Sequence, residues 1–263
     1  MNKITSQSST RPIAAAWGLR APFFFYALVT AIGFALVLVM VERSETPRAK
    51  EKISLVDLKV VVKTPSVFLV NLATFSLFFT RAGVSSTVVP LFAYKNLDMS
   101  EVVLGSILTL TAFSTFVTMI PSGSYTDKHG RKPSMMACLA LTGMVTVLIP
   151  FSTGYLGFVA VMIGYGLTLG LSGPMAAWMS DLVPRDRLGP AMGLFRTVND
   201  AGFVAGPVVL GSVAGATMDG DRLTYIPFAL AGLYLFVITV ILVKARDPVG
   251  EGKAAAPAPV IES

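Results

Sequence analysis

Residues 122–133, SGSYTDKHGRKP, place charged and turn-forming residues between two long apolar segments. Asp127 is expected near the C-terminal end of a helix, where the helix dipole disfavours a negative charge, so it needs a positive partner. Gly130 permits the positive φ of a tight turn, and Gly123 lets a neighbouring helix approach closely. A basic loop that only sets membrane topology would not need Asp127 four residues after Gly123. The segment therefore predicts a connection with a specific structure.

Ionisable residues inside apolar segments are the second group that could do chemistry. Arg81 is expected to share a helical face with Thr74 and Ser85 and to contact a substrate or coupling ion. Alternatively it reaches the membrane interface or forms a structural pair. Arg196 and Asp200 are four residues apart and can pair along one helical face, with Asp200 as the titratable member. This pair is either proton-responsive or simply neutralises two buried charges.

Small residues at four-residue spacing form a third pattern. Such spacing allows close helix packing, and the alternative is a seam or bend that moves during transport. The residues in this group are Gly166, Gly170, Gly173, Pro174, Gly202, Gly206, Pro207, Gly211 and Gly215.

Catalytic and cofactor chemistry is not indicated. Cys138 is the single cysteine and His129 the single histidine, so no metal cluster or thiol framework is expected. No phosphate-binding loop motif is present, and no nucleophile or acid–base cluster is found. We expect no enzyme, no cofactor and no metal.

The elements that carry these residues are membrane helices. The chain has 263 residues, of which 54% are hydrophobic and only 14% charged, too few charges for an ordinary soluble domain. Apolar runs of about 20 residues cross a bilayer as helices. We predict an all-α integral membrane protein with seven transmembrane helices. They span Pro22–Val41, Ser66–Phe92, Val103–Ile120, Ser134–Phe151, Leu156–Met179, Ala191–Ala214 and Tyr225–Val243.

Basic residues predict the orientation of these spans. Of the 21 Lys and Arg residues, fourteen fall on one side, five fall on the other, and Arg81 and Arg196 lie within spans. The richer side is expected to be cytoplasmic and holds the C-terminus. The net charge of +6 therefore reflects topology, and no nucleic-acid partner is expected. The predicted parts are a tail (1–21), a lone transmembrane helix (22–41), a cytoplasmic linker (42–65), a six-helix part (66–243) and a disordered cytoplasmic tail (244–263).

The charged connection matches a known pattern. Gly123, Asp127, Lys128, Gly130, Arg131 and Lys132 resemble the G-x-x-x-D-[RK]-x-G-[RK]-[RK] loop of the major facilitator superfamily. That family has twelve helices in two six-helix halves, and the loop joins the second and third helices of each half. WGLRAPFFFYALV resembles the start of the sixth helix, and residues 43–64 look like the central cytoplasmic loop. The segment SDLVPRDRLGPAMGLFRTVNDAGFVAGPVVLG resembles the tenth-to-eleventh helix region of drug and sugar efflux members.

The resemblance implies one complete six-helix repeat preceded by one helix, with the family's first five helices outside this sequence. It implies a secondary transporter of a small organic solute in the plasma membrane, with a proton as the coupling ion and efflux as one direction. Its partners would be the lipid bilayer and either the N-terminal half or a second copy. The resemblance also implies that the positive partner of Asp127 would come from that first half, so Asp127 should lack a full partner within this chain. The alternatives are a non-transporting fragment or assembly subunit, and a seven-helix receptor. A retinal protein needs a lysine in the last span, which is absent.

Overall fold

The computed structural model describes residues 21–40, 64–217, 224–245 and 247. Regular secondary structure in these residues is helical, which confirms the all-α membrane fold. The chain divides into two units, 1–52 and 53–263, which we describe separately. The first contains α2 (Ala21–Met40), a 20-residue helix without a charged residue and long enough to cross a membrane.

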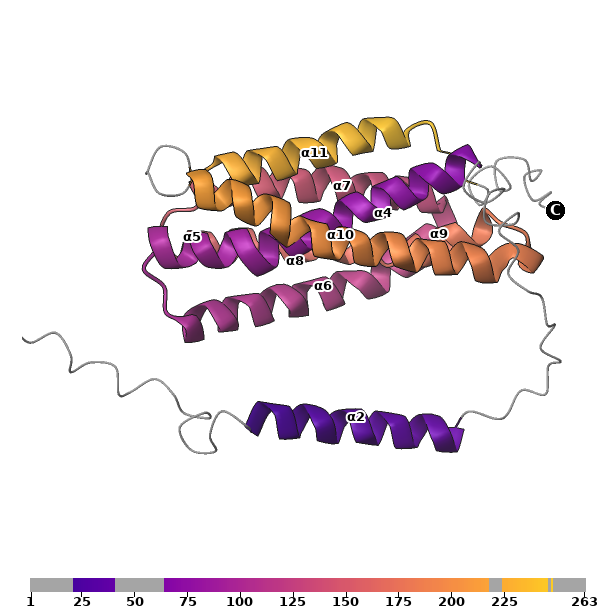
Figure 1. Ribbon diagram of the computed structural model, residues 1–263, viewed down its shortest axis with the longest axis horizontal. Coiled ribbons are helices and arrows are strands. Elements are labelled where there is room, and N and C mark those ends of the chain that lie inside the picture. Colours follow the sequence, from indigo (N-terminus) through magenta and orange to yellow (C-terminus); the bar gives the residue numbers. More distant parts are fainter. Residues whose placement is uncertain (1–20, 41–63, 218–223, 246, 248–263) are drawn as a thin grey trace, which may run out of the picture. The chain divides into compact units, whose positions relative to one another are not determined.

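The second unit is a helical bundle (Figure 1). Its helices are α4 (Pro65–Gly83), continued by the π-helix η1 (Val84–Val88) and α5 (Val89–Asn96), then α6 (Glu101–His129), α7 (Arg131–Leu148) with the short 3₁₀ turn η2 (Ile149–Phe151), α8 (Gly154–Gly170), α9 (Met175–Asp181), the 3₁₀ turn η3 (Arg185–Arg187), α10 (Leu188–Thr217) and α11 (Ile226–Leu242). Across the described residues, six helical segments, α2 included, meet the length and hydropathy expected of a membrane span. The shorter α11 has 17 residues, the lower end of the usual range.

The end of the third predicted span was wrong, and the fifth span is interrupted although its predicted bounds fall within one candidate span, Gly154–Asp181. The third span was expected to end at Ile120, but α6 continues to His129, so most of residues 122–133 is helix. Hydropathy marks where a helix leaves the membrane, whereas its end is set by Gly130, whose φ of 98° stops it. The fifth span is interrupted: α8 ends at Gly170, and α9 begins directly after Pro174.

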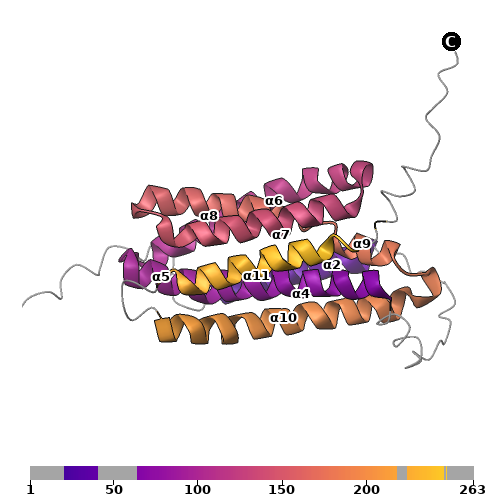
Figure 2. The ribbon, with the colours of Figure 1, turned by 90° about the horizontal axis from the view of Figure 1, so that it is seen from above.

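The bundle has an internal repeat of three helices. The principal contacts join α4 to α10, α6 to α8, and α7 to α11 (Figure 1, Figure 2). Secondary contacts join α4 to α11 and α7 to α8. Exchanging α4, α6 and α7 for α8, α10 and α11 leaves this pattern unchanged. Three helices reverse the direction of the chain, so the two repeats have opposite orientation in the membrane. Such inverted repeats are typical of secondary transporters.

Glycines lie at each of the three principal helix pairs. A Cβ atom on Gly202 would lie 2.6 Å from the Phe75 carbonyl oxygen of α4, and one on Gly206 would overlap the Phe79 carbonyl. A Cβ on Gly166 would likewise overlap a backbone carbonyl of α6. The α7–α11 pair meets at Gly143 of α7 and Gly232 of α11. Close backbone approach therefore replaces side-chain interdigitation at these contacts.

Most buried hydroxyls are satisfied inside their own helix. Thr74 on α4 donates to the carbonyl of Val70 at 2.6 Å, and Thr111 on α6 donates to that of Ile107 at 2.9 Å. This bonding lets serine and threonine lie in apolar spans without a partner on another helix. A buried hydroxyl that does not follow this rule therefore needs another explanation.

Candidate functional site

The charged end of the bundle is organised around Arg131. This residue begins α7, directly after the turn at Gly130, so its side chain lies between the ends of α6 and α9. Its Nη1 donates to Asp127 Oδ1 at 2.5 Å, and its Nε donates to Asp181 Oδ2 at 3.2 Å. The side chain of Arg131 is 16% exposed, while that of Asp127 is 66% exposed. One guanidinium thus joins two carboxylates from different helices.

Lys132 ties the same end to α11. Its Nζ donates to the carbonyl oxygen of Val243 at 2.5 Å, and its backbone N–H donates to Asp247 Oδ2 at 3.0 Å. The ammonium lies where the C-terminal carbonyls of α11 concentrate negative charge, and Asp247 lies at the start of α7, where a carboxylate is favoured. Arg131 and Lys132 therefore link α6, α7, α9 and α11 at one end.

Two details of the predicted connection differ from expectation. We expected Asp127 to lack a partner within this chain, but Arg131 pairs with it because the tight turn at Gly130 places the start of α7 beside the end of α6. We also expected a helix to approach Gly123 closely, yet a Cβ built there would meet nothing within 4 Å in the described structure. Lys128 and His129 are exposed, and the His129 ring stacks on Tyr125 with centroids 4.4 Å apart.

Arg81 lies in the middle of the longest span. By helical rise it is about 23 Å from either end of the segment Pro65–Asn96. Its side chain is exposed, but Thr74, with which it was expected to share a polar stripe, is fully buried. Arg81 makes no ion pair with any residue that the structure describes. Ser85, half-buried on η1, lies close to it along the helix.

Arg196 and Asp200 lie together on α10, with Arg196 Nε 3.1 Å from Asp200 Oδ2. Their side chains are 79% and 61% exposed, so the bundle does not bury them as expected. The reason is the position of the packing glycines, which turn another face of α10 toward α4. Asn199, between them in the sequence, is buried, and its side-chain oxygen has no partner within the part of the chain that the structure describes.

The remaining small residues have different surroundings. A Cβ on Gly170 would lie 2.5 Å from Thr118, and one on Gly211 would lie 3.0 Å from Thr87, whereas Gly215 has nothing within 4 Å. Gly173 and Pro174 occupy the break between α8 and α9. Pro207 lies inside α10 without ending it.

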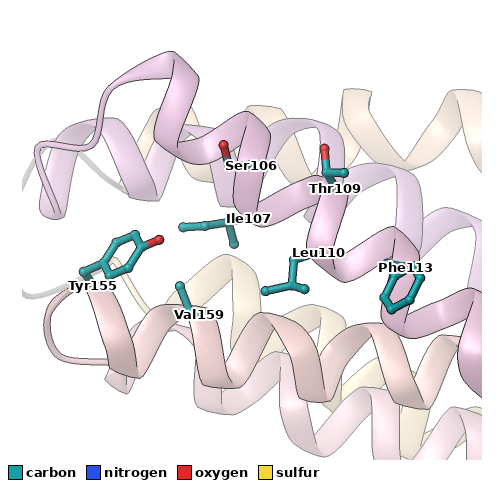
Figure 3. A pocket seen from close by; sticks show the side chains of 7 residues that line it. All are labelled: Ser106, Ile107, Thr109, Leu110, Phe113, Tyr155 and Val159. Atoms are coloured by element: carbon teal, nitrogen blue, oxygen red, sulfur yellow. The ribbon is translucent and has the colours of Figure 1, made fainter. Parts of the chain in front are cut away.

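Two open grooves lie between the helices. One, of about 440 Å³, separates the first halves of α6 and α8. Figure 3 shows Ile107 and Leu110 of α6 extending toward Tyr155 and Val159 of α8. The hydroxyl of Ser106, at its edge, donates to a carbonyl of its own helix, so this donor is already used. The surface between the two helices is mainly apolar.

The second groove, of about 250 Å³, lies between α4 and α10 and is also mainly apolar. Its lining includes Asn71, whose side-chain nitrogen donates to the carbonyl of Val67 and whose side-chain oxygen meets no partner among the described residues. Its other lining residues are Phe68, Leu72, Phe75, Leu194 and Val198.

Sequence reasoning missed three features near these sites. Asp181, the second carboxylate on Arg131, stands in the quoted SDLVPRDR segment but carried no assigned role. The π-helix has no signal in the sequence, because it depends on packing. The hydroxyl of Tyr165, buried on α8, has no hydrogen-bond partner in the described structure. Among the residues described, no group of three or more His, Cys, Asp or Glu side chains is placed to hold a metal ion.

Comparison with known proteins agrees with this architecture. A family model, Major Facilitator Superfamily, matches residues 70–262. An uncharacterized MFS-type transporter of Methanocaldococcus jannaschii is 28% identical over 180 residues, which are 67% of this chain and 44% of that protein. The multi-drug resistance efflux pump PmrA of Streptococcus pneumoniae is 29% identical over 195 residues, 70% of this chain and 47% of the pump.

Monocarboxylate transporter 1 of Mus musculus is 28% identical over 166 residues, 59% of this chain and 33% of that transporter. The chain thus spans half or less of the length of these relatives. The match covers the whole bundle with its inverted repeats and the motif at the α6–α7 turn. The chain is a multi-pass membrane protein that belongs to the Major Facilitator Superfamily.

Proposed function

We propose that this chain forms one half of a secondary transporter that moves a small organic solute across the plasma membrane. The observation that carries the proposal is the bundle of two inverted three-helix repeats with Arg81 at mid-membrane. Inverted repeats give a transporter two related conformations. A charged side chain at this depth is energetically costly, so its presence indicates a functional role. Solute movement of this kind requires no catalytic group.

Relatives indicate the range of solutes. The names of two relatives refer to multidrug efflux and to monocarboxylate transport, and both kinds of solute are small organic molecules. Export is therefore one direction that the transporter would support. The orientation that we propose puts the α6–α7 turn and the C-terminus in the cytoplasm, on the side with more Lys and Arg.

We assign proton coupling to the ion pair on α10. Asp200 is a carboxylate paired with Arg196 at 3.1 Å and accessible on the bundle surface. Protonation of Asp200 would release Arg196, so the pair has two charge states that a conformational change can distinguish. Structural neutralisation of the two charges is the competing role.

The second half would be an N-terminal half or a second copy of this chain. Alternating access requires two bundles that rock against each other around a central site, and this chain supplies one. Copies that insert with the same orientation are related by an axis along the membrane normal, as the two halves of this superfamily are. A non-transporting assembly subunit is the alternative, and a seven-helix receptor is the next, although it leaves the Arg131 network without a role.

This proposal can be tested in proteoliposomes by measuring how solute uptake depends on the protein-to-lipid ratio. The purified chain is reconstituted at increasing protein-to-lipid ratios, and uptake of benzoate and of ethidium is measured under an imposed pH gradient. We expect saturable uptake that rises with the square of density, since two copies must meet, and Asp200→Asn should remove the response to the gradient. Linear uptake would contradict the need for a second half. No uptake at any density would contradict the pairing of two copies, and would leave a different N-terminal half or the non-transporting alternative.

A further inference from the structure

Arg81 is an exposed cation on a helix face whose other residues are buried or half-buried. Leu77, Val84 and Val88 lie on the same side of this helix and are at most 2% exposed, whereas Arg81 is exposed. It lies about 23 Å from each end of its helical segment, near the middle of a hydrocarbon core of about 30 Å. Each surface of that core is about 15 Å away, which makes snorkelling difficult.

Two other arginines at the spans have carboxylate partners. Arg131 contacts Asp127 and Asp181, and Arg196 contacts Asp200. Arg81 has no carboxylate partner in the part of the chain that the structure describes. An uncompensated charge at this depth is unfavourable. Arg81 would therefore bind an anionic ligand that enters the membrane region of the protein.

A second polar group lies next to this cation. Tyr165 on α8 is fully buried, yet its hydroxyl has no hydrogen-bond partner in the described structure. The Tyr165 hydroxyl lies within electrostatic range of the Arg81 guanidinium and close to Ser85. Its geometry toward Ser85 does not meet that of a hydrogen bond. Buried hydroxyls are normally bonded, as those of Thr74 and Thr111 are. The Tyr165 hydroxyl thus has a donor available for a ligand.

The helices that carry these groups occupy equivalent positions in the two repeats. Arg81 precedes the π-helix η1 (Val84–Val88), and π-helical turns occur frequently at functional sites. Tyr165 is on α8, the helix that occupies the position equivalent to α4 in the other repeat. The two groups therefore come from corresponding helices of the two repeats, where a transporter places its ligand.

The chemistry of these donors selects a carboxylate. A guanidinium donates two parallel hydrogen bonds to the two oxygens of a carboxylate, and a tyrosine hydroxyl can add a third. One unpaired positive charge balances one negative charge, whereas a phosphate dianion would leave one charge uncompensated. We propose that Arg81 and Tyr165 bind the carboxylate of the transported solute, which is therefore a small organic monoanion. This inference rests on the proposed transport function and specifies its substrate class.

Binding measurements on the full chain in lipid nanodiscs test the inference without requiring transport. Benzoate is the probe, benzamide its neutral analogue and inorganic phosphate the competing oxyanion, with affinity measured by calorimetry. We expect Arg81→Gln to weaken benzoate binding about tenfold to hundredfold, as expected for loss of a charged hydrogen bond, and to leave benzamide binding unchanged. Tyr165→Phe should weaken benzoate binding about fivefold. Lys95→Gln, a cation at the end of the same span, is the matched control and should bind benzoate like the parent chain.

Arg81→Lys keeps the charge but loses the two-pronged geometry, so it should bind benzoate with intermediate affinity even if Arg81→Gln folds poorly. The inference is overturned if the parent chain does not bind benzoate, if Arg81→Lys and Arg81→Gln bind it as tightly as the parent, or if phosphate binds more tightly than benzoate. Arg81-dependent benzoate binding without uptake would contradict the proposed transport function alone. Uptake of ethidium without benzoate binding would contradict this inference alone.

Discussion

Arg131 is the residue on which the charged end of the bundle depends most. It is largely buried and contacts carboxylates at the ends of α6 and α9, while Asp127, one of the two, is mainly exposed. Replacing Asp127 leaves the contact between Arg131 and Asp181 in place. Replacing Arg131 removes both contacts and leaves two carboxylates facing each other. The residues of one charged turn therefore differ in their contribution to stability.

We predict a graded series of effects on unfolding in detergent. Asp127→Asn should lower the unfolding free energy by at most about 1 kcal/mol, because the pair is exposed. Arg131→Gln should lower it by about 1–2 kcal/mol, since its hydrogen bonds to charged groups are more buried. His129→Gln is the control within the same turn and should change it by less than about 0.5 kcal/mol. Equal effects of all three would show that the turn only sets topology.

Sequence reasoning at this scale identified the charged residues but assigned their partners incompletely. The contact between Asp127 and Arg131 could be predicted only if the helix were known to continue past Ile120 and to end in a tight turn at Gly130. Asp181 is fifty residues from Arg131, so its contact depends on the tertiary fold. The unpaired hydroxyl of Tyr165 had no sequence signal, because tyrosines near and within spans look alike.

At the scale of elements, hydropathy predicted the existence of every span but not the helix ends. The apolar segment ends where the chain leaves the lipid, whereas the helix ends at a capping residue such as Gly130. The end of the apolar segment and the end of the helix therefore differ where a helix extends beyond the membrane. The four-residue spacing of Gly202 and Gly206 did predict close packing. Two glycines on one face of any helix leave room for the backbone of a neighbouring helix. Gly215, in the same pattern, meets nothing, so spacing alone does not say which glycines are at a contact.

Two glycines of α10 give a matched test of that packing. Gly206→Ala would force its new methyl group into the Phe79 carbonyl of α4, whereas Gly215→Ala has open space. We expect Gly206→Ala to cost about 1–3 kcal/mol in unfolding free energy, as overpacking does. Gly215→Ala should be neutral or stabilising by up to about 1 kcal/mol, since alanine favours helix. Equal stability of the two variants in a detergent unfolding assay would mean that α4 and α10 do not pack as described.

At the scale of the whole molecule, the repeat within the bundle supports the proposal that this chain forms one half of a transporter. The contacts of α4, α6 and α7 are reproduced by α8, α10 and α11, so the bundle is complete as a packed unit of two repeats. The residues expected to face a solute, Arg81 above all, are exposed on this unit. Its exposed surface therefore carries the groups that a second bundle would enclose.

The orientation of this unit is a final prediction. Lys132 joins the start of α7 to the end of α11 through its contact with the Val243 carbonyl, so the α6–α7 turn and the C-terminal end of α11 lie on one side of the membrane. The distribution of Lys and Arg puts that side in the cytoplasm. In a Cys138→Ala background, which removes the one native thiol, His129→Cys reports this side. Thr153→Cys, exposed between η2 and α8, reports the other.

An impermeant maleimide added to intact cells should label Thr153→Cys at once and His129→Cys only after the membrane is permeabilised. Both positions are exposed, so a difference between them reflects the membrane rather than burial within the protein. A permeant maleimide is the control and should label both in intact cells. Labelling of His129→Cys from outside, with Thr153→Cys protected, would reverse the orientation and would place the Arg131 network on the external face.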